Sequence, residues 1–201
     1  MTRFIILAAS MACLGSVAGC AGEKEGGFVA IFDGKGLDGW KQIGGGGFKL
    51  VDGTIESYDG MGLLWYSKKS YKDFILRLEW KVNRKEANSG VFVRFPDPGD
   101  DVWVPVEKGH EMQICDTDGP KERTGSVFQS ADATRVPTRP VGEWNEMEIK
   151  VIGQKYEVKV NAEKVCEHTS DRSLEGYVGV QDHDPTSKVS FRNIRVKELK
   201  P

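Results

Sequence analysis

Alternating apolar and polar residues form the strongest pattern in this chain, and the pattern is clearest over residues 74–82. The apolar set is Phe74, Leu76, Leu78, Trp80 and Val82, and the residues between them are Ile75, Arg77, Glu79 and Lys81. A period of two predicts a β-strand whose first set lies in the core and whose second set mostly faces solvent. We therefore interpret Glu79 as part of a solvent-exposed ladder of ion pairs rather than as a catalytic acid.

Short runs of the same type recur along residues 28–199, with turn residues between them. Asp52-Gly53 separates runs 48–51 and 54–57 and is a strong hairpin signal. The other expected strands are 28–32, 63–67, 89–95, 109–116, 125–129, 143–152, 155–160, 164–169, 176–183 and 189–199. About a dozen short strands without a convincing amphipathic helix predict an all-β fold of two packed antiparallel sheets, a sandwich or jelly roll.

The N-terminal residues resemble a targeting signal rather than part of the fold. A basic start is followed by an apolar run, 4–14, that is too short to span a bilayer comfortably. Val17-Ala18-Gly19-Cys20 resembles the lipobox of bacterial lipoproteins. We expect a signal peptide at 1–19, lipidation of Cys20, a flexible tether at 20–27 and one domain at 28–201. We therefore expect an exported protein that is anchored to the membrane and faces the periplasm or the cell surface. The alternative is an ordinary secretory signal.

Charge and cysteine content narrow the possible classes of protein. The formal net charge is −2, both signs are interspersed, and no basic stripe indicates binding to nucleic acid. Removal of the signal and lipidation of Cys20 leave Cys115 and Cys166. Both lie in apolar runs, so we expect two separately buried thiols rather than a disulfide. No Cys/His spacing is typical of a structural zinc site.

The run 109–116 combines strand-forming residues with polar side chains. Glu111 and Gln113 point the same way on a strand, with their Cα atoms about 7 Å apart. Familiar glycosidases place two carboxylates about 5–9.5 Å apart, whereas here the second position is an amide. This spacing therefore disfavours the ordinary two-carboxylate mechanism. The long loop 96–108 before this strand carries Trp103, and an aromatic residue in a long loop often belongs to a site.

Four blocks in this order resemble a bacterial family. They are Asn88-Ser89-Gly90-Val91-Phe92-Val93-Arg94, Glu111-Met112-Gln113-Ile114-Cys115-Asp116, Gly142-Glu143-Trp144-Asn145, and Gly179-Val180-Gln181-Asp182-His183 followed by Phe191-Arg192-Asn193-Ile194. The family is named for 3-keto-disaccharide hydrolase activity, or for 3-keto-glucoside 1,2-lyase and 3-keto-2-hydroxyglucal hydratase activity. The resemblance covers residues 28–199 and implies a concanavalin A-like jelly roll.

The resemblance implies an oxidised substrate, a 3-keto-glycoside. A ketone at C3 acidifies the hydrogen on C2, so one general base can remove it while the aglycone leaves from C1, and water can then add. A separate sugar oxidoreductase would supply the substrate, because no GxGxxG nucleotide loop is present in the chain.

Several residues of these blocks are candidates for the implied roles. Glu111 or His183 is the expected base, and Arg94 is the expected partner of the developing oxyanion. The candidates for substrate binding are Gln113, Asp116, Asn88 and Trp103. A divalent metal is an alternative electrophile, with Glu111, Asp116 and His183 as candidate ligands.

Structural roles compete with these assignments. Glu111 could form an ion pair with Arg94, and His183 could cap a turn. A non-catalytic carbohydrate-binding module is the main functional alternative; it would use Trp103, Trp65 or Tyr66 for stacking and would not need Glu111. A lipid-anchored interaction domain is a third possibility, and fold alone does not separate the three.

Overall fold

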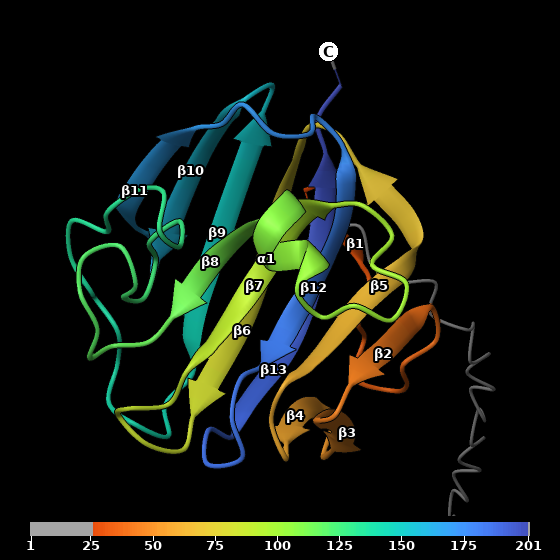
Figure 1. Cartoon of the computed structure of the whole chain (residues 1–201), viewed down its shortest axis with the longest axis vertical. Coiled ribbons are helices and arrows are strands. Elements are labelled where there is room, and N and C mark those ends of the chain that lie inside the picture. The colour runs from red at the N-terminus through yellow and green to blue at the C-terminus, as the bar shows by residue number, and fades with distance from the viewer. Residues whose placement is uncertain (1–25, 201) are drawn as a thin grey trace, which may run out of the picture.

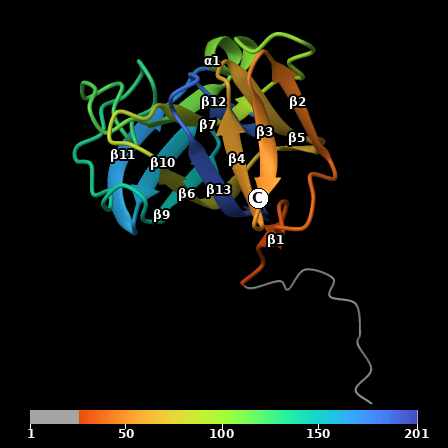
Figure 2. The ribbon, with the colours of Figure 1, turned by 90° about the horizontal axis from the view of Figure 1, so that it is seen from below.

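The computed structural model describes residues 26–200, which form two antiparallel sheets packed face to face (Figures 1 and 2). The eight-stranded sheet has the order β11-β10-β9-β6-β13-β4-β3, with β1 paired to β13, and the five-stranded sheet has the order β2-β5-β12-β7-β8. The predicted all-β, two-sheet fold is confirmed. The expected signal peptide, the lipidation site Cys20 and most of the expected tether lie outside the described residues.

The strands have the following bounds. The larger sheet contains β1 (Val29–Ala30), β3 (Gly47–Val51), β4 (Thr54–Tyr58), β6 (Phe74–Val82), β9 (Asn145–Ile152), β10 (Lys155–Val160), β11 (Glu163–Thr169) and β13 (Val189–Glu198). The smaller sheet contains β2 (Trp40–Gly44), β5 (Gly62–Tyr71), β7 (Ser89–Phe95), β8 (His110–Ile114) and β12 (Gly176–Asp182). A single short helix among the described residues, α1 (Val104–Lys108), lies in the loop between β7 and β8.

The core lies between the two sheets and follows the alternating pattern. The apolar set of β6 from Phe74 to Trp80 is at most 1% exposed, and Val91 of β7 and Met112 of β8 face it from the other sheet. Burial of apolar surface of this kind contributes about 25 cal/mol per Å² to folding. The period of two along the strands is therefore sufficient to place the core.

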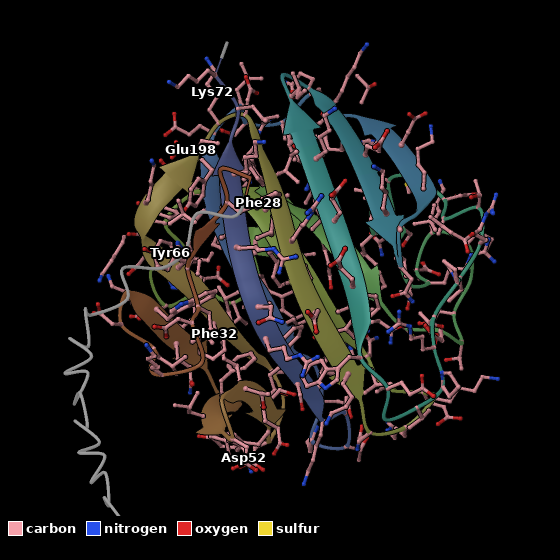
Figure 3. The ribbon with its side chains drawn as sticks, turned by 180° about the vertical axis from the view of Figure 1, so that it is seen from behind. Phe28, Phe32, Asp52, Tyr66, Lys72 and Glu198 are labelled. Atoms are coloured by element: carbon pink, nitrogen blue, oxygen red, sulfur yellow. The ribbon has the colours of Figure 1, made fainter. Side chains whose placement is uncertain are left out.

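The outer face of the larger sheet carries charged side chains in ion pairs (Figure 3). Glu79 accepts hydrogen bonds from Arg192 Nε at 2.7 Å and from Asn193 Nδ2 at 2.6 Å. It is thus in an ion pair on this face, as expected, but its partners come from β13 rather than from its own strand. Phe28 lies over the same face, with the guanidinium carbon of Arg77 4.6 Å from its ring centroid. This face is a solvated charged surface.

Three local features test the predicted elements. Asp52 and Gly53 have φ of 46° and 75° and close the β3–β4 hairpin, which confirms the predicted turn. Run 125–129 is not a strand, because Val127 makes only isolated bridges to Met112 and Ala131. Within residues 26–200, the prediction of no helix is wrong only at α1. No helix in this range is long and apolar enough to cross a membrane.

The two cysteines of the described chain are separate buried thiols. Cys115 and Cys166 are each 3% exposed, and neither forms a disulfide. Burial raises the pKa of both thiols, so both stay protonated and unreactive. The prediction of two separately buried thiols is confirmed.

A β-bulge in β7 determines where Arg94 points. Val93 pairs with Val178 of β12, but Phe95 pairs with Tyr177, so one residue of β7 is left without a partner. That residue is Arg94, whose φ is 55°. A bulge inserts one extra residue and reverses the facing of the residues that follow. Arg94 therefore does not share the outer face that simple alternation assigns to it.

The guanidinium of Arg94 is buried in contacts with loop backbone. It donates to the carbonyl oxygens of Lys72 and Gly153 and forms an ion pair with Asp73 Oδ1 at 3.2 Å, and the side chain is 1% exposed. The prediction that Arg94 faces a developing oxyanion is therefore wrong. The alternative of an ion pair with Glu111 is wrong as well. Arg94 is a structural anchor that joins the β5–β6 and β9–β10 loops.

We predict that Arg94→Lys lowers the free energy of unfolding by about 2–4 kcal/mol, because one ammonium cannot replace a fork of donors and buried carbonyls lose partners. Urea denaturation measures the change. The matched control is Arg77→Lys, since Arg77 pairs with Glu148 on the solvated face; there we expect a loss of at most about 1 kcal/mol. Equal losses in the two variants would contradict the anchoring role.

Candidate functional site

A cavity of about 290 Å³ opens on the outer face of the five-stranded sheet, the face that Figure 1 views with α1 in front. It gathers Asn88, Trp103, Glu111, Gln113 and His183, which come from the start of β7, the loop before α1, β8 and the end of β12. Five of the seven predicted catalytic and binding residues thus line one cavity.

A second, larger groove has a volume of about 510 Å³ and lies over β9, β10 and β11. Its lining includes Lys150, Tyr156, Glu167 and His168 and contains none of the predicted site residues. Volume alone does not define a site, whereas convergent polar groups in a concave pocket do. We therefore assign the functional site to the smaller cavity.

Glu111 is positioned by its neighbours on β7 and β8. It pairs with Phe92 across the strands, and the next pair on the same face is Gln113 with Gly90. A Cβ atom on Gly90 would lie 2.1 Å from Glu111 Oε1, so only glycine leaves room for this side chain. In the orientation that satisfies its amide, Gln113 donates to Glu111 Oε1 at 3.1 Å and to the carbonyl oxygen of Ser89 at 2.9 Å. Glu111 and Gln113 point the same way, as their spacing predicts.

Burial changes the acidity of Glu111. The residue is 5% exposed, and removal of its carboxyl from water raises its pKa to about 8. Desolvation disfavours the charged form, and no cationic side chain compensates for it here. Glu111 therefore carries a proton through most of the neutral pH range and can donate it.

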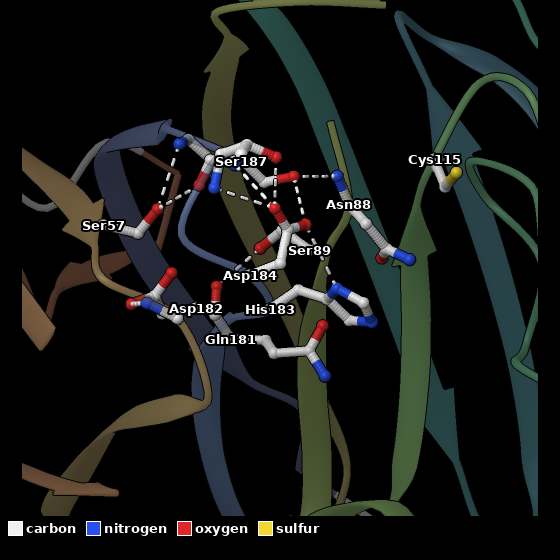
Figure 4. Close-up of polar contacts among 12 residues, drawn as sticks. Ser57, Asn88, Ser89, Cys115, Gln181, Asp182, His183, Asp184 and Ser187 are labelled. Carbon is white, nitrogen blue, oxygen red and sulfur yellow. Dashed lines mark hydrogen bonds and ion pairs between the residues drawn. The ribbon is translucent and has the colours of Figure 1, made fainter. Parts of the chain in front are cut away.

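His183 and Asn88 enter the cavity from two strand ends that share a polar network (Figure 4). His183 Nδ1 lies 3.3 Å from Asp184 Oδ2, and the Asn88 backbone N–H donates to Ser187 Oγ at 2.9 Å. The side-chain oxygens of Asn88 and Gln181 have no hydrogen-bond partner within the described chain, although both residues line the cavity. Both oxygens are buried, so they are unsatisfied acceptors in the cavity wall.

Asp116 does not reach the cavity. Thr124 Oγ1 donates to its Oδ1 at 2.5 Å, and Thr138 Oγ1 donates to its Oδ2 at 2.7 Å. Its predicted roles in substrate binding and metal ligation are therefore wrong, and the expected ligand set of Glu111, Asp116 and His183 does not assemble. Within residues 26–200, no three His, Cys, Asp or Glu side chains are grouped closely enough to hold a metal ion.

The three aromatic residues considered for stacking have different surroundings. Trp103 is 53% exposed and lies at the cavity. Trp65 is buried and packs edge-on against Tyr177, with ring centroids 4.8 Å apart. Tyr66 packs edge-on against Trp40. Only Trp103 of these three is placed to contact a ligand in the cavity.

The cavity also contains six residues for which the sequence pattern gives no assignment: Met61, Val106, Asp118, Glu122, Phe128 and Gln181. Asp118 and Glu122 lie in loop 117–124, which follows β8 directly, so its charged composition is the one available signal. Arg123 of this loop turns away and donates to the carbonyl oxygen of Ala133 at 3.0 Å. Among the described residues, no lysine or arginine lines the cavity.

We predict that Glu111→Gln gains stability relative to the native protein as pH rises. The carboxyl titrates near 4.5 when unfolded and near 8 when folded, so the native protein loses stability as pH rises between these values. Glutamine does not titrate, so the stability difference should grow from about pH 5 to about pH 8 and then level off. Urea denaturation across this range measures it. A difference independent of pH would show that the folded carboxyl is not desolvated.

Residues 27–197 match the model of a family described as the 3-keto-alpha-glucoside-1,2-lyase-like domain. The 3-keto-disaccharide hydrolase of Bacteroides thetaiotaomicron is 29% identical to the chain over 231 residues, an alignment that covers 86% of this chain and 79% of that protein.

Solved structures share the fold. A Parabacteroides distasonis protein provisionally named a glycosyl hydrolase has a TM-score of 0.76 at 24% identity, covering 87% of this chain and 95% of that one. The carbohydrate-binding module CBM66 from Bacillus subtilis has a TM-score of 0.62 at 12% identity, and the match covers 80% of this chain and 96% of that one. These likenesses agree with the predicted jelly roll. Because the family model spans most of the chain, this protein belongs to the family of 3-keto-α-glucoside-1,2-lyase-like domains.

Proposed function

We propose that this protein cleaves glycosides that carry a ketone at C3, by removing the C2 proton and expelling the aglycone from C1, with water adding to the product. Membership of the family and the name of the Bacteroides thetaiotaomicron relative support a hydrolase that acts on such sugars. The observation that carries the proposal is the meeting of a buried, proton-bearing Glu111 and His183 in one cavity.

The two groups have complementary tasks in this reaction. His183 takes the proton from C2, and the electron pair of that C–H bond forms the C1–C2 double bond. As the C1–O bond breaks, Glu111 gives its proton to the departing oxygen, so that the aglycone leaves as a neutral alcohol. With Arg94 buried elsewhere, the neutral donors that we assign to the ketone oxygen are the amide NH₂ groups of Asn88 and Gln181, which line the cavity.

A carbohydrate-binding module is the second candidate. The exposed Trp103 at the cavity and the fold shared with a binding module favour it. Such a module would gain nothing from a buried carboxyl whose desolvation destabilises the protein at high pH. Substitution of Glu111 therefore separates the two candidates.

The sequence around Cys20 supports a lipid-anchored enzyme that acts outside the cytoplasm. Mass spectrometry of the mature N-terminus checks this part of the proposal.

We predict that Glu111→Gln lowers kcat/KM for a 3-keto-glucoside by about 10²–10⁴-fold, the usual contribution of a general acid or base. Glu79→Gln, which removes a carboxylate from the solvated face, is the matched control and should leave turnover unchanged. For the native enzyme, kcat/KM should fall as pH rises through about 8, because Glu111 then loses the proton that it donates.

The leaving group separates the acid role from the base role. A p-nitrophenyl aglycone departs without protonation, so Glu111→Gln should lose much less activity on a p-nitrophenyl 3-keto-glucoside than on a methyl 3-keto-glucoside. Equal losses would assign Glu111 to proton removal instead. Full activity of the variant on both substrates would rule out any role for Glu111 in proton transfer and favour the binding module.

We predict that the site prefers neutral substrates. Asp118 and Glu122 line the cavity without a basic residue, and a like charge at short range costs roughly 1 kcal/mol or more. A substrate with a carboxylate on its aglycone should therefore react about 10-fold more slowly than its neutral counterpart. The double variant Asp118→Asn, Glu122→Gln should narrow this ratio, measured as kcat/KM for the two substrates. An unchanged ratio would contradict the role of these residues.

A further inference from the structure

The carboxylate of Asp184, the residue after His183, accepts several hydrogen bonds (Figure 4). Its Oδ1 accepts from the Thr186 N–H at 2.9 Å, from Thr186 Oγ1 at 2.5 Å and from the Ser187 N–H at 3.0 Å. Its Oδ2 accepts from Ser187 Oγ at 2.5 Å and faces His183 Nδ1 at 3.3 Å. The turn after β12 is thus built around this one carboxylate.

These contacts keep Asp184 ionised. Partial burial opposes ionisation, but hydrogen bonds from Ser187, Thr186 and His183 outweigh it and hold the pKa of this carboxyl well below its usual range. An ionised carboxylate is an acceptor only. The ring nitrogen that faces it must therefore be the one that carries a proton, which leaves Nε2 of the neutral imidazole as an acceptor.

The same carboxylate joins the two strand ends that frame the cavity. Ser187 Oγ donates to Asp184 and also accepts from the backbone N–H of Asn88, at the start of β7. The carbonyl oxygen of His183 accepts from the Met61 N–H at 3.3 Å. The backbones of three segments that line the cavity are therefore tied together next to Asp184.

Other charged groups around His183 are more distant or lie across the cavity. Arg84 Nη2 is 3.6 Å from Asp184 Oδ1, on the side of the carboxylate away from the imidazole contact. Glu111, Asp118 and Glu122 line the cavity that His183 faces. Asp184 is the one acidic side chain of the described chain in direct contact with the imidazole.

We propose that Asp184 is a positioning residue: it holds the proton of His183 on Nδ1, so that Nε2 faces the cavity as a proton acceptor, and it aligns His183 with Asn88 through Ser187. The catalytic consequence rests on the proposed function, in which His183 removes the C2 proton. The tautomer of His183 and its dependence on Asp184 do not rest on the proposed function.

Nitrogen NMR of the ring tests the inference without substrate. The chain has three histidines, so ¹⁵N-histidine labelling together with a His183→Gln variant assigns the His183 signals. In the native protein, the neutral imidazole of His183 should carry its proton on Nδ1. In Asp184→Asn the proton should shift toward Nε2, because the acceptor that holds it on Nδ1 is lost. Thr186→Val, which removes one donor to the carboxylate but keeps its charge, is the matched control and should retain the native tautomer.

Kinetics complete the test. Asp184→Asn should lower kcat/KM for a 3-keto-glucoside by about 10–100-fold, less than the full contribution of a base, and Thr186→Val should leave it nearly unchanged. Native His183 protonated at Nε2, or a tautomer unchanged in Asp184→Asn, would overturn the inference. If the tautomer behaves as expected but His183→Gln turns over normally, the base assignment in the proposed function fails and the tautomer inference stands.

Discussion

The burial of one carboxyl group on β8 is the constraint on which the proposed site depends. Glu111 lies against the backbone of Gly90, and any larger residue at that position would occupy the space of its side chain. Among the described residues, only the Gln113 amide hydrogen-bonds to the carboxyl, so the charged form has little to replace its lost water. The protein therefore maintains a proton-bearing acid at neutral pH at a cost in stability, which is common at catalytic sites.

Two carboxylates outside the cavity have a structural task. Asp116 is held by the hydroxyl groups of Thr124 and Thr138, and it fixes the start of the loop that forms one wall of the cavity. Asp184 organises the turn after β12 in the same way. Both accept several hydrogen bonds, whereas Glu111 accepts few. The hydrogen bonds of Asp116 and Asp184 therefore fix loops, whereas Glu111 is left free for the proposed proton transfer.

The jelly roll itself does not decide between binding and catalysis, because a carbohydrate-binding module shares the fold. Trp103 at the cavity suits either function. The buried pair of Glu111 and Gln113 on the sheet, with His183 in the same cavity, is what a reaction requires and a binding surface does not. The proposed function therefore depends on a few side chains on the outer face of the smaller sheet, while the larger sheet supports the core.

Local periodicity was enough to determine most strands, the core set of β6, the hairpin at Asp52-Gly53 and the shared orientation of Glu111 and Gln113, because a period of two is a property of consecutive residues. Arg94 was misplaced because a bulge reverses the alternation, and no local signal marks this bulge. Loop 117–124 lines the cavity together with α1 and the end of β12 because β12, β7 and β8 are neighbours in the smaller sheet, so its contribution was decided by strand pairing between distant segments. Sequence alone thus determined which residues share a strand face, whereas the tertiary structure decided which of those faces meet.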